Sequence, residues 1–384
     1  MKKLLRKPYL VEEFSGIRYS QGDLSKLICP PYDVISQEEK KNLENLSPYN
    51  FVRIELPENA KTAKKFLNLL KDKKILIREK NPSLYVYQQE FSISKKKFTR
   101  TGFFSALKLD PQKIYKHEKI TLKPIHQRFE LLKETKTCTS PIFCLFSDRK
   151  NKIEKILLKI TSKKPEFEFT DKENIKHRLW ILSDQKIIME LKESIEKSDI
   201  VIADGHHRFH TSLLYKEKFP SADRILAYLC SIEDRGVVIL PTHRVVKNRP
   251  EIKLKIEKYF NLSKWDGKSK PQIVCYFNGE FNMLKPKNIS YLKKFLKNKL
   301  LLSIPAIVLH KLILDEVNPE DIFYTKNIDE AIKEAQRING YAFLLESTPI
   351  KSVFLLSKQG EIMPPKTTYF YPKVPAGIVC YSHE

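Results

Sequence analysis

The sequence predicts an α/β fold of the mixed α+β type, built on a mixed sheet and divided into two regions. Residues 180–219 alternate between apolar runs and helical patterns, in the order strand, helix, strand, helix. After Pro250 the pattern changes to a helical and mixed region. With 384 residues, 41% of them hydrophobic, the chain is long enough for one large domain or two ordinary ones. We therefore expect an α/β domain over residues 1–250 and an α+β region over residues 251–384.

The elements of the first region follow from apolar periodicity. Ser36, with Glu39 three residues later, is typical of a helix N-terminus, because the serine oxygen can accept a backbone N–H there. Residues 60–76 place apolar side chains on one helical face. The other predicted helices are residues 129–136, 186–197 and 209–219. The predicted strands are residues 51–56, 84–87, 98–109, 141–146, 180–182, 200–203, 227–232 and 237–240.

The second region mixes helices and strands. We expect helices over residues 252–260, 305–317 and 329–337, a strand over residues 273–277, and paired strands over residues 341–346 and 352–357. Prolines near both ends hold residues 363–373 extended. This segment presents two lysines and two hydroxyls, which suit a phosphate, at Lys366, Thr367, Thr368 and Lys373. It is either a packed strand or a segment that returns to a functional site in the first region.

The most informative motif is the turn at residues 204–208, Asp-Gly-His-His-Arg. It follows an apolar strand and opens a helix, which is the geometry that surrounds an anion with backbone N–H groups and positive charge. Asp204, at the end of the strand, can bind a metal or accept a proton. Gly205, His206, His207 and Arg208 then supply the turn, two imidazoles and a guanidinium. The 204–208 turn therefore predicts chemistry on a phosphorylated substrate.

Two other interpretations of this turn stay open. Asp-Gly is a good turn sequence by itself, so that Asp204 could only cap the helix while both histidines are solvated. His206 and His210 lie one helical turn apart, as zinc ligands do, but no fourth ligand is evident. His243 and Arg244, which follow a predicted strand, form a weaker site candidate.

Three further segments carry candidate functional residues. Paired prolines stiffen the loop before Tyr32 and Asp33 and so fix the directions of both side chains. His117 and Glu118 are neighbours that can supply a base or a metal ligand. Arg128, at the start of a predicted helix, can bind a carboxylate or phosphate through two parallel hydrogen bonds.

Composition limits the function classes. A net charge of +24 often indicates nucleic-acid binding, but Lys outnumbers Arg about four to one and is spread along the chain. This charge favours anionic substrates without identifying one.

The six cysteines form no C-x-x-C pair, and no apolar run of 18 residues occurs. We expect a cytoplasmic protein with reduced thiols and no membrane span. The Walker loop and G-x-G-x-x-G patterns are missing.

These motifs, in this order, resemble a widespread prokaryotic family known as domain of unknown function 1015. The motifs that carry the resemblance are residues 30–35, 84–87, 100–102, 117–118, 203–208 and 363–373. The 204–208 turn also resembles the signature of the ParB and sulfiredoxin-like superfamily, which implies a core of that type. That superfamily includes a nucleotide-dependent kinase of free serine, in which such a turn holds phosphates. Residues 203–210 contain no cysteine, which argues against sulfiredoxin chemistry.

The resemblance implies a phosphotransferase that acts on free serine or O-phosphoserine with ADP or ATP and Mg²⁺. Glu118 or Asp33 would take the proton from the serine hydroxyl, and Asp204 would hold Mg²⁺ or orient His207. The candidate catalytic residues are Asp33, His117, Glu118, Asp204, His206, His207 and Arg208. Tyr32 and Arg128 would bind the substrate, with Lys366 as a second candidate for its carboxylate. Nucleotide binding is expected at Gly205, Lys366, Thr367, Thr368 and Lys373. A ParB-like nucleic-acid-binding protein or nuclease, and a metabolite sensor without turnover, are the alternatives.

Overall fold

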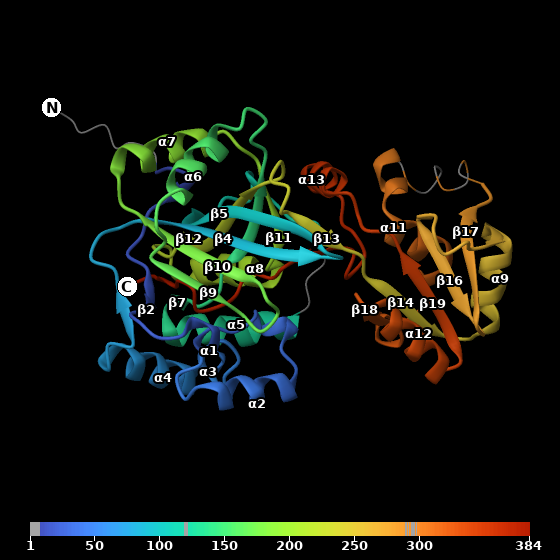
Figure 1. Cartoon of the computed structure of the whole chain (residues 1–384), viewed down its shortest axis with the longest axis horizontal. Helices are drawn as coiled ribbons and strands as arrows, with labels where there is room; N and C mark the ends of the chain where they lie inside the picture. Colours follow the sequence, from blue (N-terminus) through green and yellow to red (C-terminus); the bar gives the residue numbers. More distant parts are fainter. Residues whose placement is uncertain (1–7, 119–121, 289, 291, 293–295, 297) are drawn as a thin grey trace. The chain divides into compact units, whose positions relative to one another are not determined.

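The computed structural model describes residues 8–118, 122–288, 290, 292, 296 and 298–384 (Figure 1). These residues form two compact units. Unit 1 consists of the described residues within Met1–Lys116, Ile120–Val237 and Pro372–Glu384, and unit 2 of those within His117–Lys119 and Val238–Tyr371. The chain thus passes into unit 2 after Val237, earlier than the boundary expected at residue 250, and its last residues belong to unit 1.

In the part of the chain that the structure describes, unit 1 is built around a nine-stranded mixed sheet of order β6-β11-β8-β12-β5-β4-β10-β9, with β1 beside β5. β11 is parallel to β6 and β12 to β8, and the other neighbours are antiparallel. The central strand β8 is buried at all five positions, which explains its continuous apolar sequence. The strands are β1 (Val11–Glu12), β4 (Leu84–Ile93), β5 (Lys96–Lys108), β6 (Ile114–Tyr115), β8 (Ile142–Phe146), β9 (Phe167–Thr170), β10 (Lys176–Leu182), β11 (Ile200–Asp204) and β12 (Arg224–Ser231).

Helices cover both faces of this sheet (Figure 1). α6 and α7 contact β10, β4 and β1, whereas α8 contacts β8 and β12 and is itself packed against α5, which contacts α4. The helices of unit 1 are α1 (Leu24–Leu27), α2 (Gln37–Leu46), α3 (Val52–Glu55), α4 (Ala60–Asp72), α5 (Leu122–Thr135), α6 (Lys152–Thr161), α7 (Gln185–Ile195) and α8 (His206–Lys218), with the 3₁₀ turn η1 at Tyr32–Val34. Two short pairs complete it, β2 (Ile17–Tyr19) with β3 (Leu76–Arg78) and β7 (Thr137–Cys138) with β21 (Tyr381–Ser382).

Unit 2 contains an antiparallel six-stranded sheet of order β15-β17-β16-β19-β14-β18 among its described residues. α12 packs on this sheet through Ala331 and Ala335, both fully buried. The strands are β14 (His243–Lys247), β15 (Phe260–Lys264), β16 (Ile273–Phe277), β17 (Glu280–Pro286), β18 (Phe323–Thr325) and β19 (Gly340–Leu345), and β13 (Val238–Leu240) pairs separately with β20 (Tyr369–Tyr371). The helices are α9 (Pro250–Tyr259), α11 (Pro305–Leu309), α12 (Ile328–Arg337) and α13 (Ile350–Lys358), with shorter turns η2 (Lys299–Ser303), η3 (His310–Leu314) and η4 (Pro319–Asp321).

The structure confirms the predicted fold class, a mixed α/β protein with a mixed sheet and a separate α+β part, but corrects three elements. Within residues 51–56, Val52–Glu55 form the short helix α3 instead of a strand, and Asn50 Oδ1 accepts the Val52 N–H at 2.9 Å in the turn that precedes it. Residues 352–357 belong to helix α13, not to a strand paired with β19. The helix predicted over residues 305–317 ends at Leu309 and continues as the π-helical turn η3.

Two further features of the described residues concern the cysteines and the helix lengths. All six cysteines lie in the described part of the chain, where they are buried and form no disulfide. None of the helices within the described ranges combines the length and the apolar character needed to cross a membrane.

Candidate functional site

The 204–208 turn connects β11 to α8 and depends on Gly205. Gly205 takes the N-cap position of α8 with φ of +93°, where no side chain caps the helix. A Cβ at this position would lie 3.0 Å from Arg208 Nε and 3.0 Å from Ile142 Cγ2. Glycine is therefore required both by the left-handed backbone and by the close approach of Arg208. Asp204 does not cap α8, and His206 is buried, so the simple turn with solvated histidines does not describe this segment.

Asp204 is held between two cations of unit 1. Its Oδ2 accepts a hydrogen bond from Arg208 Nη2 at 2.9 Å, and its Oδ1 accepts one from Lys373 Nζ at 2.7 Å. Burial opposes ionisation of this carboxyl, but Lys373 and Arg208 outweigh it and hold the pKa of Asp204 well below its usual range. Both oxygens are thus engaged with cationic side chains. The predicted role of Asp204 as a Mg²⁺ ligand does not fit this arrangement.

Arg208 reaches from α8 back under the turn. Its Nη1 donates to the carbonyl of Pro141, and the side chain is only 8% exposed. Burial would lower the pKa of Arg208, but Asp204, Asp33 and Glu55 lie close enough to raise it above the usual value. Arg208 therefore stays charged. Its Nε is buried and has no hydrogen-bond partner among the described residues.

Arg128, on α5, is the second buried cation of this site. Its Nη1 lies 3.3 Å from Glu55 Oε1, and its Nη2 donates to the Glu55 carbonyl at 2.5 Å. The guanidinium also stacks over the ring of Tyr32, with 4.1 Å between Arg128 Cζ and the ring centroid. Burial raises the pKa of Tyr32 to about 12, so its hydroxyl stays protonated. Arg128 Nε has no hydrogen-bond partner among the described residues.

Glu55 is a functional residue that the sequence analysis missed. It is fully buried at the end of α3 and accepts hydrogen bonds from Thr139 at 2.7 Å and Ser140 at 2.8 Å, besides its contact with Arg128. No signal in the sequence indicated its burial, because the alternation of residues 51–56 puts Arg53 and Glu55 together on the polar face of the predicted strand. Glu55 fixes the position of Arg128.

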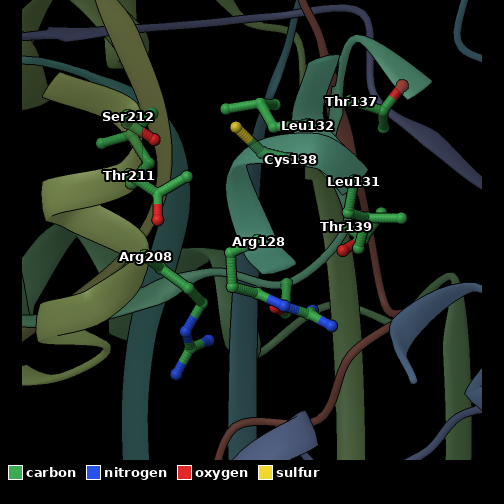
Figure 2. Close-up of a pocket in the computed structure, with 11 residues that line it drawn as sticks. Arg128, Leu131, Leu132, Thr137, Cys138, Thr139, Arg208, Thr211 and Ser212 are labelled. Atoms are coloured by element: carbon green, nitrogen blue, oxygen red, sulfur yellow. The ribbon is translucent and has the colours of Figure 1, made fainter. Parts of the chain in front are cut away.

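A cavity of about 40 Å³ lies between α5 and α8, large enough for a few water molecules. Figure 2 shows Arg128 and Arg208 at the same end of this cavity, with Thr211 and Ser212 along α8. Thr139 lies across from α8, beside Arg128. Thr211 Oγ1 is buried without a hydrogen-bond partner among the described residues. Two guanidinium groups and several hydroxyls around one cavity can bind a small oxyanion.

A second cluster of predicted residues forms within unit 2. Met363 N–H donates to the His117 carbonyl at 2.8 Å and Lys366 N–H to Glu118 Oε1 at 3.4 Å, so that the two segments run side by side. His117 Nε2 lies 3.1 Å from Thr368 Oγ1. Thr367 donates its hydroxyl to the Pro364 carbonyl at 2.7 Å and is buried, which does not suit the nucleotide contact predicted for it.

The predicted site residues therefore fall into two groups. Unit 1 brings together residues from four separate segments, namely Tyr32, Asp33, Arg128, Asp204, Gly205, His206, Arg208 and Lys373. Unit 2 brings together His117, Glu118, Lys366, Thr367 and Thr368. His207 is half-buried at the start of α8. Across the described ranges, no group of three or more His, Cys, Asp or Glu side chains is arranged to hold a metal ion, and the zinc interpretation gains no support.

The family model described as "Protein of unknown function (DUF1015)" matches residues 11–308, and the chain belongs to that family. No curated protein matches the sequence. Among solved structures, the chain is similar to a free serine kinase variant in complex with ADP, with 15% identity, a TM-score of 0.38, and coverage of 70% of this chain and 87% of that one.

Two further solved structures are similar to a comparable extent. A conserved hypothetical protein from Pyrococcus furiosus shares 15% identity, with a TM-score of 0.35 and coverage of 72% of this chain and 93% of that chain. SbnI with a C-terminal truncation from Staphylococcus aureus shares 9% identity, with a TM-score of 0.36 and coverage of 72% and 81%. Similarity at this level identifies neither a substrate nor a reaction for this chain.

Proposed function

We propose that this member of the DUF1015 family is a phosphotransferase that acts on free serine or O-phosphoserine with an adenine nucleotide. The observation that carries the proposal is the pair of buried arginines, Arg128 and Arg208. Both are 8% exposed, both keep an Nε–H donor without a partner among the described residues, and both lie at one end of the same cavity. The resemblance of the 204–208 turn to that of a free serine kinase supports the choice of serine and of the nucleotide.

The chemistry proposed for the site is charge neutralisation and positioning. Phosphoryl transfer needs cationic donors around the transferring group more than it needs covalent catalysis. Arg208 and Arg128 would donate to the phosphoryl oxygens, and their burial strengthens each interaction because water does not screen it. Asp204 and Glu55 hold the two guanidinium groups in place through ion pairs of 2.9 Å and 3.3 Å. Little reorganisation is then needed when the phosphoryl group moves.

Asp33 is the proposed base that takes the proton from the serine hydroxyl. It belongs to the same unit as the two arginines, is exposed, and is close enough to Arg208 to influence the pKa of that side chain. Glu118 is the other carboxylate with this predicted role, and it belongs to the cluster in unit 2. In the reverse direction, the same group would return the proton to the serine oxygen as it leaves the phosphorus.

The first experiment measures phosphoryl transfer in both directions with purified full-length protein. Serine is supplied with ATP, and O-phosphoserine with ADP or without nucleotide, and the released serine or phosphoserine is quantified. We expect turnover in at least one direction, lowered by about 10²- to 10³-fold in R208Q and in R128Q, since each removes a donor to the phosphoryl group. R149Q is the control, because Arg149 is exposed. Inert protein in every combination, or equal activity in R208Q and R149Q, would contradict the proposal.

The same variants separate the alternatives. Affinity for duplex DNA that falls steeply with salt and is equal in R208Q and the parent would indicate nucleic-acid binding by scattered lysines. Saturable binding of serine or nucleotide without turnover would indicate a sensor. Comparing D33N with E118Q identifies the base. We expect D33N to abolish turnover while nucleotide binding is kept. E118Q should retain turnover.

A further inference from the structure

We propose that unit 2 holds a separate ligand site, for a small monocarboxylate with an apolar body, in the cavity beside His310 and Tyr324. This cavity measures about 550 Å³, and all the residues that line it belong to unit 2. Its volume falls within the range of small-molecule sites. Apolar side chains cover much of the wall, among them Leu314, Ile322 and Met363. The cavity can therefore accept an apolar ligand of a few carbon atoms.

Two residues that line the cavity each carry a buried polar atom without a hydrogen-bond partner among the described residues. The two atoms are His310 Nε2 and Tyr324 Oη. Native proteins rarely leave buried polar atoms unsatisfied, so each such atom calls for an explanation. A phenol hydroxyl and the N–H of a neutral imidazole can each donate to one oxygen of a carboxylate.

Arg244 supplies the positive charge behind this wall. It is 1% exposed, its Cζ lies 5.6 Å from the centroid of the Tyr324 ring, and its Nη2 donates to the carbonyls of Lys366 at 3.0 Å and Pro365 at 3.5 Å. Its remaining described contact is with the carbonyl of Thr242. In the described part of the chain, Arg244 thus has carbonyls and an aromatic ring as partners but no carboxylate.

The missing counter-charge does not lie in the rest of the sequence either. Residues 1–7, 119–121, 289, 291, 293–295 and 297 include no Asp or Glu. A buried cation is costly unless an anion accompanies it. Burial lowers the pKa of Arg244 to about 10, and burial together with Arg244 lowers the pKa of His310 to about 4. An anionic ligand beside His310 and Tyr324 would raise the pKa of both Arg244 and His310, because its negative charge would stabilise their protonated forms.

The other charges around the cavity narrow the class of ligand. Lys311 and Asp315 form an ion pair of 3.1 Å and largely cancel each other, while Glu361 adds a negative charge to the lining. A doubly charged phosphate ester would be repelled by these acids more than a singly charged carboxylate. The apolar wall in turn favours a hydrocarbon body. A short-chain carboxylate satisfies both conditions.

The backbone around His310 is an independent sign of function. α11 ends at Leu309, and the helix continues as the π-helical turn η3, of which His310 is the first residue. Single π-helical turns inside helices are uncommon and occur frequently at functional sites. The irregular turn and the unsatisfied imidazole thus coincide at one residue.

The test is calorimetric titration of full-length protein with hexanoate, with hexylamine and inorganic phosphate as matched probes. We expect saturable binding of hexanoate at one site per chain, weakened at least about tenfold in Y324F and in H310L, because each loses a donor to a charged group. Y341F is the control, because Tyr341 stacks on Phe277 and does not line the cavity. Hexylamine and phosphate should not bind saturably.

Thermal melting of the ligand-free protein supplies a second readout. Y324F removes a buried hydroxyl that has no partner, so we expect an unchanged or higher Tm together with weaker hexanoate binding; a purely structural tyrosine would lower the Tm. No saturable binding of hexanoate, equal affinity in Y324F, H310L and Y341F, or preference for phosphate would each overturn the proposal. None of these outcomes depends on phosphoryl transfer in unit 1.

Discussion

Lys373 Nζ lies 2.7 Å from Asp204 Oδ1, 169 positions earlier in the sequence. This ion pair ties the last segment of unit 1 to the end of β11, at the start of the 204–208 turn. Arg208 shares the same carboxylate through its other oxygen. The Asp204 carboxylate that holds the Arg208 guanidinium is therefore itself held by a lysine far along the chain.

The Asp204 ion pairs should contribute measurably to stability. Lys373 and Asp204 have side-chain exposures of only 14% and 18%, so K373M is expected to lower the free energy of unfolding by about 3 kcal/mol, because an incompletely paired buried charge remains. A double-mutant cycle with D204N should give a coupling energy of about 1 to 3 kcal/mol by urea denaturation. The control K253M, which removes an exposed pair with Glu257, should change stability by less than about 0.5 kcal/mol. Additive effects of K373M and D204N would contradict this account.

Gly205 should be far less tolerant of substitution than another left-handed glycine. G205A places a Cβ 3.0 Å from Arg208 Nε and Ile142 Cγ2, whereas a Cβ at Gly279, with φ of +83°, meets no atom within 4 Å. Both variants carry the backbone strain of about 1 kcal/mol, so the difference between them measures the contacts with Arg208 and Ile142. We expect G205A to lose more stability than G279A and to weaken binding of a phosphorylated ligand, as measured by titration. Equal losses in both variants would show that the contact relaxes freely.

Glu55 is expected to act on ligand binding through Arg128. E55Q keeps the shape of the side chain but removes the charge that pairs with Arg128, so Arg128 should become less fixed while remaining cationic. Stability should fall by about 3 kcal/mol, as expected for a buried charge that loses its partner. Phosphoserine affinity should fall as well. The matched variant T139V removes one hydrogen bond to Glu55 and should cost only about 1 kcal/mol. Unchanged affinity in E55Q would show that Arg128 needs no support.

His243 should make the stability of the protein depend on pH. Burial, followed by the neighbouring charge of Arg244, lowers the pKa of His243 from 6.5 to about 4. Between these values the unfolded chain takes up a proton that the folded protein does not, so the free energy of unfolding should decrease as the pH falls from 6.5 to 4. The expected change is about 1.4 kcal/mol per pH unit for this group.

H243N tests this assignment. The Asn oxygen can accept the Leu345 N–H that His243 Nδ1 accepts at 3.1 Å, but it does not titrate. Urea denaturation between pH 7 and pH 4.5 should therefore show a shallower pH dependence in H243N. The pH dependence of the free energy of unfolding should not vanish in H243N, because burial also lowers the pKa of His310 and His383 to about 4. An identical slope in H243N and the parent would exclude His243 as a source.

Local patterns predicted most of the sheet in unit 1 but not the contacts that shape the site. β8 and β12 are nearly continuous apolar runs, as is typical of strands buried on both faces, and both were predicted from the sequence. Residues 352–357 are also apolar but form the helix α13, with Leu356 buried and Leu355 exposed. A short apolar run is compatible with either element, and only its packing partners decide between them.

Among the site residues as well, the sequence revealed local patterns but not tertiary contacts. The 204–208 turn was recognised because a strand end, a glycine and a helix start are adjacent in the sequence. Glu55 was not, because its partner Arg128 lies 73 positions away and no local pattern links them. Lys373 was expected to bind a nucleotide, but its engagement with Asp204 depends on a tertiary contact that composition cannot reveal.

The return of residues 372–384 to unit 1 bears on the order of events during biosynthesis. Ala376 pairs with Cys29, Cys380 with Ile17, and β21 with β7, so the earliest strands receive these neighbours only after all of unit 2 has left the ribosome. Until then the nascent chain has no Lys373 to meet Asp204. The 204–208 turn thus gains its ion pair with Lys373 only after unit 2 has been translated, and a polypeptide that stops before Lys373 would carry the 204–208 motif in an unfinished form.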